Sequence, residues 1–120
     1  MNWKSSIIVA ALLLVFLLLK RVGLIPVREA RELLEEGAIV IDVRTEHEFA
    51  GGHLPRAINI PLDQIEIMAP QQIKDMNQVL LLYCHSGISS AAAARRLKRM
   101  GYTSALILGS LARATRITHA

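Results

Sequence analysis

The chain has few of the residues on which several classes of protein depend. Its 120 residues include a single cysteine, Cys84, so no intramolecular disulfide can form, and a lone thiol agrees with a reducing compartment. Aromatic residues make up 4% of the chain, and no basic patch interleaved with aromatics accompanies its net charge of +4. The histidines His47, His53 and His85 lack the spacing typical of metal ligands. We therefore expect no nucleic-acid partner and no bound metal.

One long apolar run lies near the N-terminus. Ile7–Leu19 contains no polar residue, and it is flanked by Trp3 and Lys4 on one side and by Lys20 and Arg21 on the other. About 20 apolar residues span a bilayer, and snorkelling lysines would extend this slightly shorter run. No small-residue cleavage site follows it, which argues against a cleaved signal peptide. The lack of a polar face argues against a buried helix.

These features predict a membrane-bound protein with three segments. Residues 1–22 are expected to form a single-pass transmembrane anchor in the cell inner membrane, residues 23–26 a short linker and residues 27–120 the folded domain. Lysine and arginine are more frequent after the apolar run than before it, which by the positive-inside rule places the domain on the cytoplasmic side. The lipid bilayer is therefore one expected partner.

Strand and helix patterns alternate along the rest of the chain. Short β-branched or strongly apolar runs predict strands at 38–43, 57–60, 79–83 and 104–108. Helical spacing and terminator residues predict helices at 27–36, 62–68, 71–76 and 90–100. A capping box, Thr45-x-x-Glu48, predicts a further brief helical turn. Strands that alternate with helices predict an α/β domain of three layers around a mostly parallel sheet.

The cysteine stands where the most apolar predicted strand ends. The polar segment Cys84–Ser90, which contains one glycine, leads directly into a predicted helix. Backbone N–H groups in such a turn, together with the positive end of the helix dipole, stabilise a thiolate or an anion bound to it. The alternative is a buried, unreactive cysteine. Ligands of parallel α/β sheets bind at the carboxyl ends of the strands, so Asp42 and Arg44 are expected at the same rim.

Two groups of motifs resemble a known family. The first group consists of Ile41-Asp42-Val43-Arg44, Glu48-Phe49 and the segment from Gly52-His53-Leu54-Pro55 to Pro61. The second consists of Tyr83-Cys84-x-Ser86-Gly87, a following helix and Gly101-Tyr102. In this order, over about residues 26–109, the motifs resemble the single-domain rhodanese (thiosulfate sulfurtransferase-like) family. The resemblance implies that residues 27–120 form a three-layer rhodanese-like domain.

The resemblance implies a sulfurtransferase that uses Cys84 as its sulfur carrier. The Cys84 thiolate would take sulfane sulfur from thiosulfate, a polysulfide or a thiol persulfide, and a thiol, including a protein thiol, or cyanide would accept it. No cofactor is implied. Asp42 and Arg44 are expected to support the active-site loop. The loop residues that are expected to bind the substrate are His85, Ser86, Gly87, Ile88, Ser89 and Ser90.

Two positions depart from the family pattern. A basic residue usually stands five positions after the cysteine, where this chain has Ser89, and we therefore expect weaker binding of a dianion such as thiosulfate. His85 could supply part of the missing charge, since imidazole is partly protonated near neutral pH. After the last strand, Gly109-Ser110 replaces the usual Gly-Gly and no tryptophan follows, so the final helix is expected to be short or frayed.

Two other functions are alternatives to the enzyme. A catalytically weak rhodanese-like module that binds a membrane or peripheral partner stays open, and Ser89 favours it. A phosphatase or arsenate reductase with a similar loop would need a cation on the oxyanion. Neither Ser89 nor Ser90 supplies one, which argues against this class.

Overall fold

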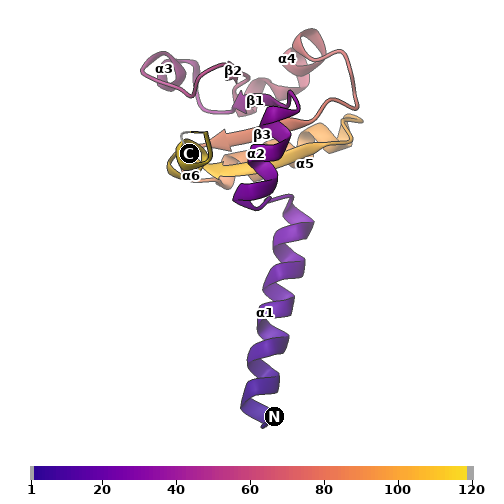
Figure 1. The fold of residues 1–120 in the computed structure, drawn as a ribbon. Coiled ribbons are helices and arrows are strands. Elements are labelled where there is room, and N and C mark those ends of the chain that lie inside the picture. The colour runs from indigo at the N-terminus through magenta and orange to yellow at the C-terminus, as the bar shows by residue number, and fades with distance from the viewer. Residues whose placement is uncertain (1, 119–120) are drawn as a thin grey trace.

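The computed structural model describes residues 2–118, in which an N-terminal helix precedes an alternation of strands and helices (Figure 1). The elements are α1 (Trp3–Val22), α2 (Val27–Glu35), β1 (Ile39–Asp42), α3 (Glu46–Ala50), β2 (Ile58–Asn59), the 3-10 helix η1 (Leu62–Gln64), α4 (Ile65–Gln72), β3 (Leu80–Cys84), α5 (Ile88–Arg99), β4 (Ala105–Ser110) and α6 (Leu111–Thr118). All strand pairs are parallel, in the order β2-β1-β3-β4. The predicted α/β class with a parallel sheet is confirmed.

Helices cover both faces of the sheet because its central strands are apolar on both sides. All of β3 is buried, and its side chains alternate between two cores. Leu80 and Leu82 pack in the core that contains residues of α4 and α5, whereas Leu81 and Tyr83 pack in the core that contains residues of α2 and α6. Figure 1 shows α2 and α5 on opposite sides of the sheet. The domain therefore has three layers.

The register brings the carboxyl ends of β1 and β3 together. Asp42 of β1 pairs with Tyr83 of β3, and the N–H of Val43 donates to the Tyr83 carbonyl at 3.0 Å. On the other side of β3 the register with β4 shifts, so that Leu108 is an extra residue opposite this strand. Such bulges redirect a strand near functional sites. The chain thus leaves β1 and β3 at one edge of the sheet, as the sequence predicts.

The predicted helix at 71–76 was wrong. The chain instead forms η1 and then α4, which continues through Pro70 and ends at Gln72. Pro70 lacks the N–H that would bond the Glu66 carbonyl, and its ring crowds that carbonyl, but the helix ends two residues later, so little of the helix is disturbed. A turn follows, in which the N–H of Asn77 donates to the Asp75 carboxylate at 2.8 Å.

The final helix is short, as expected, but well anchored. In α6, Ala114 and Ile117 are buried in the core shared with α2. The guanidinium of Arg31 in α2 donates to the carbonyls of Ile117 and Arg116 at 3.2 and 3.3 Å. These bonds satisfy carbonyl groups at the C-terminal end of the helix.

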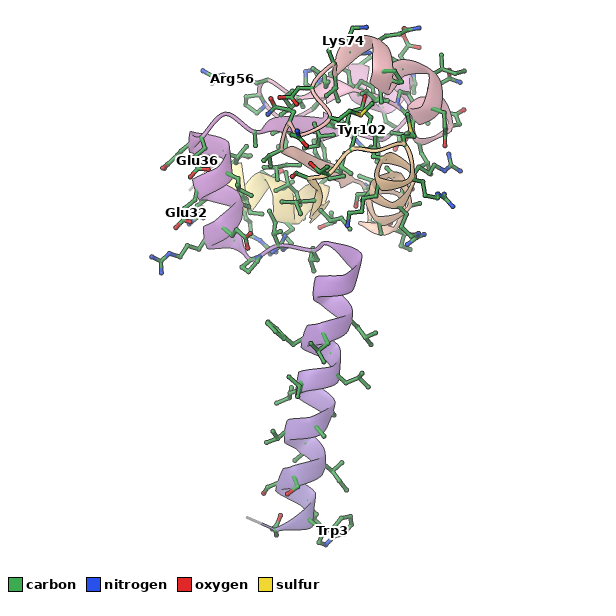
Figure 2. The ribbon with its side chains drawn as sticks, turned by 90° about the vertical axis from the view of Figure 1, so that its right-hand side faces the viewer. Trp3, Glu32, Glu36, Arg56, Lys74 and Tyr102 are labelled. Atoms are coloured by element: carbon green, nitrogen blue, oxygen red, sulfur yellow. The ribbon has the colours of Figure 1, made fainter. Side chains whose placement is uncertain are left out.

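Helix α1 extends away from the sheet, with side chains on all sides and Trp3 at its far end (Figure 2). Its large apolar side chains from Ile7 to Leu18 are at least 50% exposed. The prediction of a transmembrane anchor was wrong, since no helix in the described part of the chain is long and apolar enough to cross a membrane. As a helix, the run Ile7–Leu19 rises about 20 Å, against about 30 Å of bilayer hydrocarbon.

The other membrane expectations depended on that anchor. The single-pass inner-membrane location, the cytoplasmic placement of the domain and the lipid partner are therefore withdrawn. The segment boundaries at residues 22 and 26 stay predictions.

Candidate active site

The thiol of Cys84 lies at the end of β3, beneath the N-terminus of α5. The residue is 2% exposed. The backbone nitrogens of Gly87 and Ser90 lie 2.8 and 3.3 Å from its Sγ, and both donate to the sulfur. Gly87 precedes α5 in a left-handed conformation with φ of 97°, which glycine adopts without steric cost. Two backbone donors and a helix N-terminus therefore stabilise negative charge on the sulfur.

The loop that holds the thiol is closed mainly by its own hydrogen bonds. The buried Ser90 hydroxyl donates to the Gly87 carbonyl at 2.8 Å. The N–H of Leu111 in α6 donates to the His85 carbonyl at 3.4 Å, which connects the loop to the final helix. Ile88, by contrast, is 78% exposed. The loop presents backbone donors inward and an apolar side chain outward.

A pocket of about 420 Å³ opens at the thiol. Of the residues that the sequence indicated, the pocket brings together Arg44, Cys84, His85, Ser86 and Ser89. Gly87 and Ile88 line a different hollow on the other side of the loop. Ser90 and Asp42 are buried behind the site, so they shape it from within the fold.

Sequence reasoning missed three charged residues of this pocket. Glu48 was expected to serve the capping box and was named in a family motif but not as a site residue, and neither Asp63 nor Arg96 was expected in the site. All three line the pocket beside Cys84. Arg96 stands seven residues after Ser89, which places both on one face of α5 and could have identified it. Asp63 lies in η1, and nothing in the sequence predicts how that turn packs.

Asp42 and Arg44 form a buried ion pair at the end of β1. Their side chains are 0% and 9% exposed, and Nη2 of Arg44 lies 2.8 Å from Oδ2 of Asp42. Nη2 also donates to the Gly52 carbonyl at 2.7 Å, which ties the strand end to the loop after α3. The hydrogen bond to Asp42 is the main cause that raises the pKa of Arg44. The two charges neutralise each other within the pocket wall.

Tyr83 connects the ion pair to the cysteine strand. Its ring lies 5.9 Å from the guanidinium carbon of Arg44, and its hydroxyl accepts a bond from the Leu54 N–H at 3.1 Å. Burial is the main cause that raises the pKa of Tyr83 to about 12. The residue immediately before Cys84 is therefore a neutral phenol that holds the loop around Leu54 in place.

The predicted capping box at the start of α3 is present. The Thr45 hydroxyl accepts from the Glu48 N–H at 3.2 Å, and Oε1 of Glu48 accepts from the Thr45 N–H at 3.2 Å. This backbone bond from Thr45 is the main cause that lowers the pKa of Glu48. The carboxylate that faces the pocket is thus negatively charged at neutral pH. Residues 2–118 contain no cluster of histidine, cysteine, aspartate and glutamate that could hold a metal ion.

Comparison with known proteins agrees with this geometry. The rhodanese-like domain family matches residues 26–112. Thiosulfate sulfurtransferase PspE of Escherichia coli is 36% identical over 63 residues, which cover 52% of this chain and 61% of that protein. Thiosulfate sulfurtransferase GlpE of Pseudomonas fluorescens is 32% identical over 79 residues, 66% of this chain and 71% of that protein.

A solved structure extends the likeness to the fold. The human single-domain sulfurtransferase TSTD1 is 27% identical and has a TM-score of 0.68, over 78% of this chain and 96% of that one. The chain spans less than two thirds of the length of the Escherichia coli relative. The family match nevertheless takes in most of the chain, including both strand ends that form the pocket. The chain belongs to the rhodanese-like domain family.

Proposed function

We propose that this protein is a rhodanese-type sulfurtransferase that carries sulfane sulfur as a persulfide of Cys84. The observation that carries the proposal is the convergence of the Gly87 and Ser90 N–H groups on Sγ beside an open pocket. These donors stabilise negative charge on the sulfur, and they would equally stabilise the charge of a bound persulfide. Two relatives named as thiosulfate sulfurtransferases support the same reaction class.

The reaction has two steps and needs no electron from outside. The Cys84 thiolate attacks the outer sulfur of thiosulfate, the bond between the two donor sulfurs breaks, and sulfite leaves with the bonding electron pair. Polysulfides and thiol persulfides would react in the same way, with a shorter polysulfide or a thiolate as the leaving group. Cyanide or a thiol, including that of a protein, then attacks the terminal sulfur of the persulfide and regenerates the thiolate. We assign this chemistry to residues 27–120, preceded by the linker 23–26 and the N-terminal segment 1–22.

The loop residues have distinct roles in this proposal. Gly87 and Ser90 supply the backbone donors, while Ser86, Ser89 and His85 face the substrate. Ile88, which lies outside the pocket, is placed to meet a larger acceptor such as a protein thiol. Asp42 and Arg44 fix the opposite wall.

One experiment separates the carrier from a weak binding module, the alternative that Ser89 favours. The full chain is incubated with thiosulfate, with polysulfide and with a thiol persulfide, and its intact mass is measured. The carrier gains one sulfur atom, cyanide removes it as thiocyanate, and Cys84→Ser abolishes the gain. A chain that gains no sulfur from any donor is a binding module, and the proposal then fails.

A further inference from the structure

The pocket at Cys84 carries charges of both signs. Glu48 and Asp63 contribute carboxylates and Arg96 contributes a guanidinium, whereas the charge of Arg44 is neutralised by its buried ion pair. With Cys84 as a thiolate, the charge around the sulfur is negative on balance. Such a site opposes the approach of a dianion such as thiosulfate. A donor with its own positive charge suits the site better.

Asp63 is the carboxylate that a cationic group would meet. It is exposed in η1, and its side chain has no hydrogen-bond or ion-pair partner among the residues that the structure describes. Glu48, in comparison, is held through Oε1 by the hydroxyl of Thr45 at 2.9 Å. Asp63 therefore gives up no existing contact when it binds a ligand ammonium, and Glu48 adds a second negative charge at the same pocket.

Arg96 is the positive group that lines the same pocket. Its Nη1 donates to the Leu62 carbonyl at 2.9 Å, and its Nε lies 3.8 Å from the Glu66 carboxylate. These contacts hold the guanidinium at the rim, with 35% of the side chain exposed. In the described part of the chain Nη2 has no hydrogen-bond partner, so it can donate to a ligand carboxylate.

We propose that the preferred sulfur donor is a small zwitterionic thiol persulfide of the amino-acid type. Its ammonium pairs with Asp63 and Glu48, and its carboxylate binds Arg96. The pocket volume of about 420 Å³ leaves room for a ligand of this size. This inference rests on the proposed persulfide carrier and names its donor class. His85 lines the same pocket and adds positive charge only where it is protonated.

The transfer step balances without a further reactant. The Cys84 thiolate attacks the outer sulfur of R–S–SH, the Sγ–S bond forms and the donor S–S bond breaks. R–S⁻ leaves with the electron pair and takes the proton from the new Cys84–S–SH. The products are R–SH and the Cys84 persulfide anion, whose charge the Gly87 and Ser90 N–H groups stabilise.

A panel of four donors tests the proposal on the full chain. They are cysteine persulfide, cysteamine persulfide (which lacks the carboxylate), 3-mercaptopropionate persulfide (which lacks the ammonium) and thiosulfate. The measured quantity is the second-order rate constant for sulfur gain, followed by quenched intact mass. The rate constant for cysteine persulfide should be about fivefold higher than that for either persulfide that lacks one of the two charged groups. This difference should become smaller at high salt.

Single substitutions test which residue binds the ammonium of the donor and which binds its carboxylate. Asp63→Asn should slow the two ammonium-bearing persulfides about fivefold and speed thiosulfate. Arg96→Gln should slow the carboxylate-bearing persulfides and leave cysteamine persulfide unchanged. Glu46→Gln is the matched control: it removes one negative charge from α3 outside the pocket and should change no rate. If Arg96→Gln is unstable, Arg96→Lys is measured in its place. This variant keeps the positive charge and should still react faster with cysteine persulfide than with cysteamine persulfide.

The outcomes distinguish this inference from the function on which it rests. Equal rate constants for the three persulfides, or an Asp63→Asn effect that is the same for all four donors, overturn the zwitterion proposal and leave the sulfur carrier intact. Sulfur gain from none of the four donors overturns the carrier itself.

Discussion

The two neighbouring strand ends that form the candidate site differ in how they stabilise charge: one uses paired side chains and the other uses backbone N–H groups. At the end of β1, Asp42 and Arg44 are buried side chains of opposite charge that neutralise each other. At the end of β3, Cys84 has no charged partner and is surrounded by the backbone donors of Gly87 and Ser90. The fold depends on both members of the charged pair, because removal of either leaves the other buried and uncompensated. Backbone donors stabilise negative charge on the sulfur without a fixed counter-charge, which suits the proposed persulfide carrier.

The largest effect is expected at the β1 end. Asp42→Asn should lower the free energy of unfolding by about 3 kcal/mol, because the buried Arg44 then lacks a counter-charge. Urea denaturation measures the loss. The control is Glu32→Gln, which breaks the Arg28–Glu32 pair, whose side chains are 92% and 60% exposed, and should cost about 0.5 kcal/mol or less. Equal losses in the two variants would contradict the role assigned to burial.

Tyr83, which connects the two strand ends, should have the next largest effect. Tyr83→Phe leaves the buried Leu54 N–H without its acceptor and should cost about 1–3 kcal/mol at neutral pH. Burial raises the pKa of Tyr83 to about 12, against about 10 in the unfolded chain. The stabilisation from the neutral phenol is therefore complete below pH 10 and is lost as the pH rises towards 12.

This pH dependence gives the Tyr83 prediction a second measurement. By linkage, two pH units correspond to about 3 kcal/mol of unfolding free energy. Urea midpoints recorded between pH 9 and 12 should fall less steeply for Tyr83→Phe than for the parent chain. Identical slopes would show that the phenol ionises in the folded state as easily as in the unfolded state.

At the end of β3, the next prediction concerns the left-handed backbone conformation of Gly87. Gly87→Ala forces a Cβ onto a residue with φ of 97° and should cost about 1–2 kcal/mol. The new Cβ would lie 3.5 Å from the Gly109 carbonyl carbon, an ordinary contact, so backbone strain is the cause. Sulfur gain by Cys84 should slow as well, because the Gly87 N–H moves away from Sγ.

Gly37 provides a matched control for this prediction. It also has φ of 97°, and a Cβ there would have no atom within 4 Å. Gly37→Ala should therefore cost about the same stability and leave the rate of sulfur gain unchanged. Equal slowing in both variants would mean that global stability, and not the geometry at Sγ, controls the reaction.

The same comparison shows what the sequence could predict. The turn at Cys84 and the capping box of Thr45 and Glu48 depend on residues close together in the chain, so local patterns identified them. Strand alternation also predicted the parallel sheet and the shared edge of Asp42 and Cys84. Asp63 and Arg96 were not predicted as site residues, because their place at the pocket depends on how η1 packs against α5. This tertiary contact has no local signal in the sequence.

Two errors have physical causes. Pro70 was expected to separate two helices, but it lies near the end of α4, where the disturbance of the preceding turn affects little of the helix. The apolar composition of Ile7–Leu19 predicted a transmembrane anchor, yet this run rises only about 20 Å, and no helix in the described part of the chain is long and apolar enough to cross a membrane. In the first case the position of the proline within the helix decides its effect, and in the second the length of the apolar run outweighs the extension expected from the flanking lysines.

The smallest expected effect comes from giving the β3 loop the fixed side-chain charge that the β1 end already has. Ser89→Arg adds a cation to the pocket at Cys84 and should lower the apparent KM for thiosulfate about fivefold, or about 1 kcal/mol. Steady-state formation of thiocyanate from thiosulfate and cyanide measures it. Gln71→Arg places the same charge on α4, away from this pocket, and should leave KM unchanged. The gain should shrink at high salt, because the added charge acts on a dianion through partly exposed surroundings. An unchanged or raised KM for Ser89→Arg would mean that the backbone donors alone set the affinity for thiosulfate.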